Sequence, residues 1–274
     1  MPQEAVLRNA TIVLRDEVKT GAVLIRDGFI ADLSSSSAVG EDMDGDYLIP
    51  GLVELHTDHL EGHYSPRPGV RWNAIAAVQA HDAQIAASGI TTVFDCLRMG
   101  SDEDGGFDPH EMRLLADAIE AAQSHGRLRA EHLLHLRCEV SSPDVLDALE
   151  RFRDDRNVRL ASLMDHAPGQ RQFQTMEQYT LYYKTKRGMS DEAFERYVAT
   201  RKEQSARYSS VHRKAIAEHC RDAGVTLASH DDATLAHVDE AITDGVRLAE
   251  FPTSLEAARA SHEAGMSVLM GAPN

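Results

Sequence analysis

The sequence has few cysteines, no long apolar run and no excess of basic residues. Its three cysteines, Cys96, Cys138 and Cys220, are far apart and form no CxxC pair, which argues against a disulfide framework and favours a reducing cytoplasm. No segment has the length of a membrane span, and the amino terminus lacks the apolar core of a signal peptide. Lysine and arginine number 28 against 44 acidic residues, and the net charge of −16 argues against binding to nucleic acid or an anionic membrane.

The first 47 residues predict a small β-subdomain. Residues 4–33 alternate short apolar runs with turns such as Asp27-Gly28, which is typical of antiparallel strands. A polar loop rich in serine, glycine and aspartate follows at 34–46. We therefore assign residues 1–47 to the N-terminal part of a small β-sandwich subdomain.

From residue 48 the pattern changes to apolar strands that alternate with amphipathic helices, as in parallel βαβ units. Because a glycine-rich dinucleotide fingerprint is missing, an α/β fold of the (β/α) TIM-barrel type is favoured for 48–274, with a doubly wound sheet as the alternative. A closed barrel has eight strands, so this one is expected to lack its eighth strand and to be incomplete at the C-terminus. Seven strands are predicted, at 48–55, 90–94, 133–138, 158–164, 225–229, 246–250 and 267–270.

Polar residues of metal-ligand or ion-pairing type follow nearly every predicted strand. In a barrel, catalytic residues gather at the carboxyl ends of the strands, and alternate residues of a strand point the same way. Imidazoles and carboxylates suit zinc, manganese or iron, and several carboxylates can bridge two ions. The residues in question are His56, Asp58, Asp95, Arg98, Arg137, Glu139, Asp165, His166, His230, Asp231, Asp232, Glu250 and Asn274.

Several of these residues also have a structural interpretation. His56 and Asp58 could form a hydrogen-bonded pair, and Glu139 could form an ion pair with a nearby arginine. Asp232 is predicted to cap the next helix, whereas His230, at the strand tip, is predicted to be a ligand.

Other candidate residues could either contact the metal directly or support a metal ligand from behind. Asp165 and His166 are candidates both for contact with a metal and for a supporting position behind a ligand. Asp95 and Glu250 are predicted to be supporting polar groups. His132, His135, His212, His219 and His262 are predicted to be ordinary core or surface residues.

Cationic side chains near the strand ends could bind an anionic substrate in spite of the negative net charge. Arg98 follows the second strand, and Arg67 lies in the rigid turn Ser65-Pro66-Arg67-Pro68. A polar and aromatic insertion at about 168–205 carries Arg171, Lys184 and Lys186. The alternative for this insertion is a solvated loop or a subunit contact.

Four motifs carry a resemblance to a known family: IPGLVELHTDHLE, EHLLHLRCE, SLMDHAPGQRQF and LASHDDAT. With them the chain resembles the amidohydrolase superfamily, from about Ala5 to Asn274. Within it, the motifs are similar to the branch that hydrolyses a ribose 5-triphosphate in phosphonate catabolism, in which the first strand bears His-x-Asp. The resemblance implies that water attacks a phosphorus of the triphosphate, releasing diphosphate from a ribose 1-phosphonate 5-phosphate.

The resemblance also implies roles for residues. His56, Asp58 and His230 correspond to metal ligands, and Glu139 to a bridging carboxylate, for zinc in one or two ions, with manganese or iron as alternatives. Asp165 and His166 are placed as catalytic residues on the fourth strand. Arg67, Arg98, Arg171, Lys184 and Lys186 are assigned to the substrate.

Members of the superfamily have an aspartate on the eighth strand that usually holds the attacking water. That aspartate is absent from this chain, so we expect the 274 residues alone to be poorly stable and weakly active or inactive. The implied partner is a small anionic triphosphate, with no nucleic acid or membrane. A homo-oligomer is possible, and the sequence leaves the oligomeric state open. The alternatives are a hydrolase or deaminase of C–N bonds and a noncatalytic metal-binding fragment.

Overall fold

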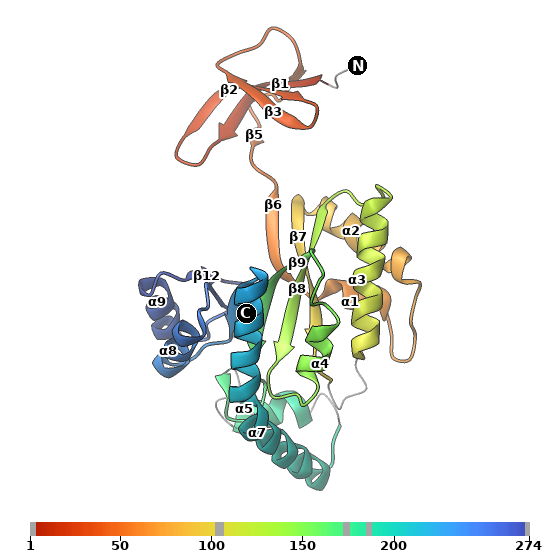
Figure 1. Ribbon diagram of the computed structural model, residues 1–274. Coiled ribbons are helices and arrows are strands. Elements are labelled where there is room, and N and C mark those ends of the chain that lie inside the picture. Colours follow the sequence, from red (N-terminus) through yellow and green to blue (C-terminus); the bar gives the residue numbers. More distant parts are fainter. Residues whose placement is uncertain (1–3, 102–106, 172–175, 185–187, 272–274) are drawn as a thin grey trace. The chain divides into compact units, whose positions relative to one another are not determined.

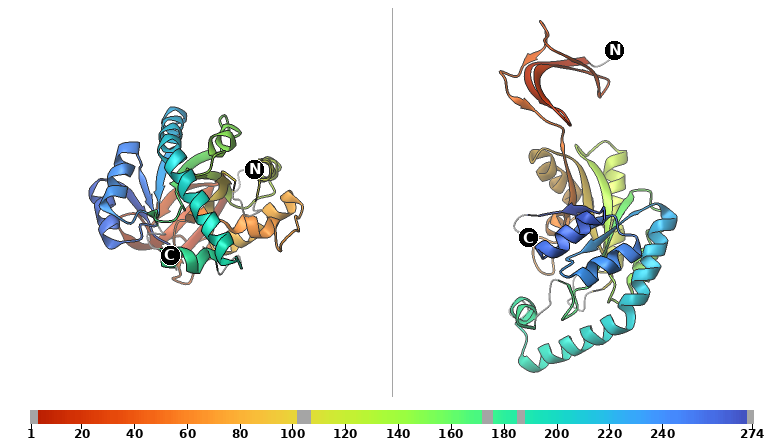
Figure 2. Two further views of the ribbon diagram at one scale, coloured as in Figure 1. Left: turned by 90° about the horizontal axis from the view of Figure 1, so that it is seen from below. Right: turned by 90° about the vertical axis from the view of Figure 1, so that its left-hand side faces the viewer.

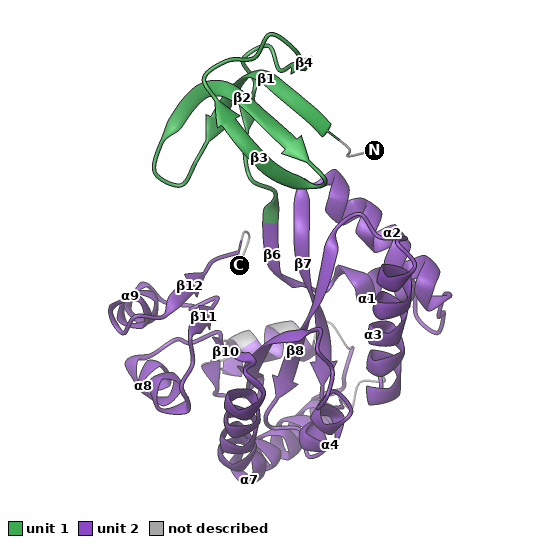
Figure 3. Ribbon diagram, turned by 45° about the horizontal axis from the view of Figure 1, so that its top comes forward, with its two compact units in different colours: residues 1–52 green, residues 53–274 purple. Residues whose placement is uncertain are grey.

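The structure, a computed structural model, describes residues 4–101, 107–171, 176–184 and 188–271. The chain divides into two compact units, residues 1–52 and 53–274 (Figure 3). Among the described helices, none combines the length and the apolar character needed to cross a membrane. Lys186 and Asn274, which the sequence analysis singled out, lie outside the described residues.

The N-terminal unit is a five-stranded sheet in which β1 pairs with three other strands, β2, β4 and β5. β1 and β2 are antiparallel, as are β2 and β3, while β4 and β5 run parallel to β1. The antiparallel strands therefore form as expected, and a β-sandwich stays a prediction. The strands are β1 (Glu4–Val13), β2 (Val18–Arg26), β3 (Phe29–Ser34), β4 (Glu41–Asp42) and β5 (Tyr47–Leu48).

The second unit contains a seven-stranded sheet in the order β12-β11-β10-β9-β8-β7-β6, with parallel pairing from β7 through β12 (Figure 1). This order confirms the predicted succession of βα units and a TIM-like arrangement. Within the described residues, β6 and β12 form the two ends of the sheet. The strands are β6 (Leu52–Thr57), β7 (Ile90–Met99), β8 (Glu131–Glu139), β9 (Val158–Met164), β10 (Thr226–His230), β11 (Leu248–Glu250) and β12 (Ser267–Leu269).

Helices cover the outer face of this sheet, and local sequence signals fix where they begin. The side chain of Asp108 accepts hydrogen bonds from the first turn of α3, and the side chain of Glu111 accepts one from the backbone amide of Asp108, which completes a capping box. The helices are α1 (His59–Tyr64), α2 (Ala74–Ala87), α3 (Pro109–Ser124), α4 (Val145–Glu150), α5 (Met176–Tyr179), the π-helical turn η2 (Thr180–Lys184), α7 (Asp191–Ala223), α8 (Leu235–Asp244) and α9 (Leu255–Glu263).

Helix α7 has 33 residues and begins at Asp191, within the insertion that was predicted at about 168–205 (Figure 2). Ser190 caps its first turn, and no glycine or proline interrupts the chain before Gly224, which ends the helix with φ 68°. The second half of the predicted insertion is therefore part of a regular helix. The early turns of α7 bring Arg201 close to Ser141, just beyond β8.

Alternation along β8 separates the apolar core from the interior of the curved sheet. Leu134 and Leu136 pack in the main core with residues of α2 and α3. The intervening His135 and Arg137 face the other way: His135 donates to or accepts from Ser162 on β9, and Arg137 reaches Asp58 after β6. Period-two alternation thus directs polar residues to the inner face.

A fully buried polar cluster lies between the sheet and α2. The two oxygens of Asp95 lie 2.8 Å from Nε2 of His81 and 2.7 Å from Nδ1 of His132. None of these three side chains is exposed to solvent. Burial alone would raise the pKa of Asp95, but hydrogen bonds from the two histidines hold that pKa below its ordinary value.

Candidate active site

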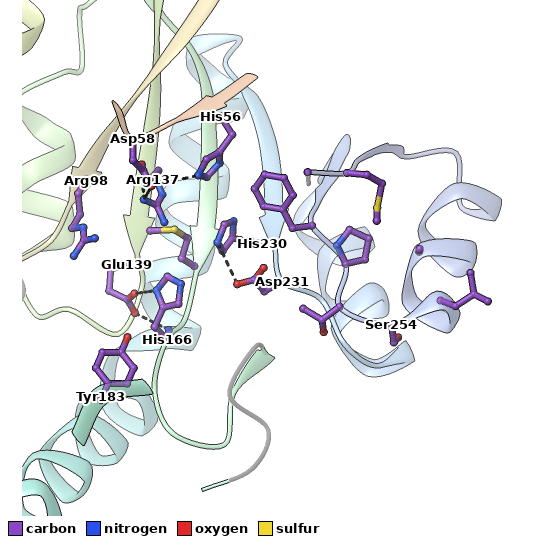
Figure 4. A pocket seen from close by; sticks show the side chains of 18 of the residues that line it. His56, Asp58, Arg98, Arg137, Glu139, His166, Tyr183, His230, Asp231 and Ser254 are labelled. Carbon is purple, nitrogen blue, oxygen red and sulfur yellow. Dashed lines mark hydrogen bonds and ion pairs between the residues drawn. The ribbon is translucent and has the colours of Figure 1, made fainter. Parts of the chain in front are cut away.

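A cavity of about 830 Å³ opens at the carboxyl ends of the strands (Figure 4). It has the size of a small-molecule site. Five of the predicted residues line it, from β6 to β10: His56, Asp58, Glu139, His166 and His230. Arg98, from β7, lines it as well. The structure therefore brings together the strand-end residues that the sequence analysis proposed for the metal, and one of the five proposed for the substrate.

Glu250, at the end of β11, connects two of the histidines. Its Oε2 lies 2.8 Å from Nδ1 of His230, and its Oε1 lies 2.8 Å from Nδ1 of His56. Burial alone would raise the pKa of Glu250, but the surrounding imidazoles, including His135, hold it well below its ordinary value. Glu250 is thus a buried carboxylate in contact with two histidines of the cavity.

Glu139 and His166 form a second pair on the opposite side. Nδ1 of His166 lies 2.7 Å from Oε2 of Glu139, and Oγ of Ser141 donates to Oε1. Nη2 of Arg201, on α7, lies 3.4 Å from the same carboxylate. Burial alone would raise the pKa of Glu139, but His166, Arg201 and Ser141 lower it to about 2. Glu139 is therefore ionised throughout the neutral range.

Asp58 is held by a buried arginine. Nη1 of Arg137 lies 2.7 and 2.8 Å from its two oxygens, and Nε2 of His56 lies 4.0 Å from Oδ2. Burial opposes ionisation of Asp58, but Arg137 and His56 lower its pKa below the ordinary value. The carboxylate therefore faces the cavity in its charged form.

Asp231 and Phe251 follow strands β10 and β11 with positive φ values of 55° and 53°. Non-glycine residues in this region are uncommon and concentrate at functional sites. Both line the cavity, and Oδ2 of Asp231 lies 3.4 Å from Nε2 of His230. Asp231 was not predicted to be a ligand, because two adjacent aspartates, Asp231 and Asp232, are also typical of a helix N-cap.

Asp165, a predicted catalytic residue, does not line the cavity. Its Oδ2 accepts hydrogen bonds from Ser205 and Ser209 of α7, and its Oδ1 accepts one from the amide of Ala167. These donors satisfy the carboxylate and attach the loop after β9 to α7. Its place in the structure is thus that of an anchor for α7.

Three of the predicted substrate-binding residues lie elsewhere. Arg67 is exposed and bridges to Val70 in its own turn. Arg171 is buried, where it pairs with Asp232 and, at 2.7 Å, with Glu240 of α8. Lys184 pairs with Asp191. None of the three lines the cavity.

The prediction that Asp232 caps the following helix was wrong. Thr234 is the N-cap of α8, and its side chain accepts from the amide of His237. Asp232 instead pairs with Arg171, a contact between residues 61 positions apart that no local signal reveals. Arg201, which was not predicted as a site residue, reaches the cavity from α7, and Tyr183 of the predicted insertion reaches it from the segment that precedes α7.

The donor set fits a divalent metal ion. Four groups of described residues each offer three ligand atoms within 4.8 Å of one another, and two of these groups contain His230 of the cavity: His56, His230 and Glu250, and His166, His230 and Asp231. Nitrogen and oxygen donors at this density suit zinc, manganese or iron.

Comparison with solved structures shows the fold. The chain is similar to L-hydantoinase from Arthrobacter aurescens (14% identity, TM-score 0.56, 96% of this chain and 57% of that one) and to an uncharacterized metal-dependent hydrolase from Pyrococcus furiosus (11%, TM-score 0.55, 97% and 76%). It is also similar to dihydropyrimidinase from Brevibacillus agri NCHU1002 (15%, TM-score 0.51, 97% and 56%). The chain therefore spans somewhat more than half the length of the dihydropyrimidinase and hydantoinase chains. These similarities show a TIM-like fold, with the metal-type donors at the carboxyl ends of its strands.

Sequence comparison shows the family. No family model matches the chain. Over 272 residues it is 46% identical to alpha-D-ribose 1-methylphosphonate 5-triphosphate diphosphatase from Escherichia coli (strain K12), a match that covers 98% of this chain and 72% of that protein. The chain belongs to the family of this diphosphatase, which confirms the resemblance found in the motifs.

Proposed function

We propose that this protein hydrolyses alpha-D-ribose 1-methylphosphonate 5-triphosphate to ribose 1-methylphosphonate 5-phosphate and diphosphate, as a step of phosphonate catabolism. The observation that carries the proposal is the 46% identity to a diphosphatase across nearly the whole chain. The cavity supports it, because anionic donors for a metal and cationic side chains for phosphates line the same space.

We further propose that His56, Asp58, Glu139, His166 and His230 hold one or two zinc ions, with manganese or iron as alternatives. This assignment moves His166 from a catalytic role to the donor set, since it groups with His230 and Asp231. A divalent ion at these residues would polarise a phosphoryl oxygen and favour ionisation of a water molecule.

The remaining groups of the cavity suit the substrate. Arg98 and Arg201 approach it from β7 and α7, and arginine is well suited to bidentate recognition of phosphate groups. Their guanidinium groups would neutralise the triphosphate and fix its orientation relative to the donor set. Arg137 is committed to Asp58 and would hold that carboxylate in place. A homo-oligomer, a cytoplasmic location and the boundary at residue 47 stay predictions.

The activity is tested by diphosphate release. The zinc-loaded protein should release diphosphate from the ribose triphosphate, and removal of metal by a chelator should abolish the release until a divalent ion is restored. Hydantoin and dihydrouracil serve as control substrates of the C–N class and should not turn over. Metal binding without diphosphate release under any metal would overturn the proposal, and turnover of the cyclic amides alone would replace it with C–N hydrolysis.

Replacement of Arg98 by alanine should lower kcat/KM for the triphosphate by about 10- to 100-fold. A charged hydrogen bond to phosphate contributes about 1.5–3 kcal/mol, and each 1.36 kcal/mol is a factor of ten. Steady-state kinetics should place most of the loss in KM. Arg259→Ala, which removes an exposed arginine of α9, is the matched control and should leave the kinetics unchanged. Equal kinetics for wild type and Arg98→Ala would exclude the assigned role.

A further inference from the structure

Glu250 contacts two of the proposed histidine ligands through its carboxylate. Its side chain is fully buried at the end of β11, and its two oxygens lie 2.8 Å from Nδ1 of His56 and 2.8 Å from Nδ1 of His230. The two histidines come from β6 and β10, so the contact joins strands that are far apart in the sheet order.

We propose that Glu250 is a positioning residue that accepts the Nδ1 protons of both His56 and His230 and thereby directs both Nε2 atoms toward the metal. An ionised carboxylate has no proton to donate, so each nitrogen in contact with it must be a donor. A neutral imidazole that carries its proton on Nδ1 has its lone pair on Nε2. The inference rests on the proposed metal-dependent function.

The surroundings of the two Nε2 atoms fit this role. Nε2 of His56 lies 4.0 Å from Oδ2 of Asp58, and Nε2 of His230 lies 3.4 Å from Oδ2 of Asp231. The two rings are stacked, with their centroids 5.6 Å apart and their planes at 17°. One carboxylate thus holds two parallel imidazoles, each of which presents a nitrogen beside another carboxylate. Glu250 therefore fixes the orientation of both histidines, so that His56 lies beside Asp58 and His230 lies beside Asp231 in one donor set.

The arrangement predicts an asymmetric effect of Glu250→Gln. Glutamine keeps one acceptor oxygen but places an amide donor against the second histidine. That histidine must then accept at Nδ1 and carry its proton on Nε2, where it can no longer bind a metal. Loss of an outer-shell partner of this kind lowers metal affinity about 10- to 100-fold.

The test reads histidine tautomers in the metal-free protein, so that it does not depend on activity. Nitrogen-15 NMR of the full chain with labelled histidine should show His56 and His230 protonated at Nδ1, assigned with His56→Gln and His230→Gln. In Glu250→Gln, one of the two should shift to the Nε2-protonated form. Nε2 protonation of both residues in the wild type, or unchanged tautomers in the variant, would overturn the proposal.

Metal titration provides the second measurement. Zinc affinity, determined by competition with a chromogenic chelator, should fall about 10- to 100-fold in Glu250→Gln, with an unchanged far-ultraviolet circular dichroism spectrum. Asp244→Asn is the matched control, because it also neutralises a largely buried carboxylate, one at the end of α8 that pairs with Arg213 of α7 at 2.7 Å. Equal zinc affinity in wild type and Glu250→Gln would refute the role. If the tautomers and affinity change as expected while no diphosphate is released, the proposed function fails and the inference about Glu250 stands.

Discussion

Replacement of His230 by alanine is expected to lower kcat/KM about 1000-fold and to reduce the amount of bound metal. His230 belongs to both groups of potential ligand atoms, so its removal weakens both at once. Charge stabilisation by a metal contributes several kcal/mol to the transition state, and a loss of about 4 kcal/mol corresponds to a factor of about 1000. Elemental analysis and diphosphate release, measured on the same preparation, check the two effects together.

His262→Ala is the control for this experiment, because it removes an exposed histidine from α9. It should keep the metal content and the rate of the wild type. Thermal unfolding of both variants separates a site effect from a loss of fold, since His230→Ala also deprives Glu250 of a partner. Full metal content and full activity in His230→Ala would show that the donor set lies elsewhere.

The strands and their polar ends were predictable because they depend on local pattern. Apolar runs of strand length, each followed by a helix, gave the seven strands, and the rule that sites lie at carboxyl ends selected His56, Asp58, Glu139 and His230. All four line the cavity. What the pattern could not supply was the direction of each side chain once the strand had ended.

Asp165 and Arg171 illustrate this difference. Both follow β9 and looked like site residues, but Asp165 is satisfied by serines of α7, and Arg171 by acids of the β10–α8 region. These partners are between 40 and 69 residues away in the sequence. Arg201 shows the converse case. It reaches the cavity only because α7 is continuous from Asp191, and a helix of 33 residues was not expected there.

The buried cluster around Asp95 is the second place where a single substitution should have a large effect, here on stability. Asp95→Ala should lower the free energy of unfolding by about 3–5 kcal/mol, the range for removing one partner of a buried ion pair. His81 and His132 would each retain a buried nitrogen without its acceptor. Urea denaturation followed by circular dichroism measures the change. Asp239→Ala, at an exposed position of α8, should stay within about 0.5 kcal/mol of the wild type.

The pH dependence of this difference identifies its origin. Burial opposes the charge of His132, but Asp95 and Asp82 outweigh it and raise the pKa of His132 above its ordinary value. A raised folded-state pKa adds stability that is complete below the unfolded pKa of about 6.5 and is lost as the pH rises through the folded-state value. The deficit of Asp95→Ala should therefore be largest near pH 6 and should shrink toward pH 9. A deficit that is independent of pH would mean that packing, and not the charged pair, stabilises this region.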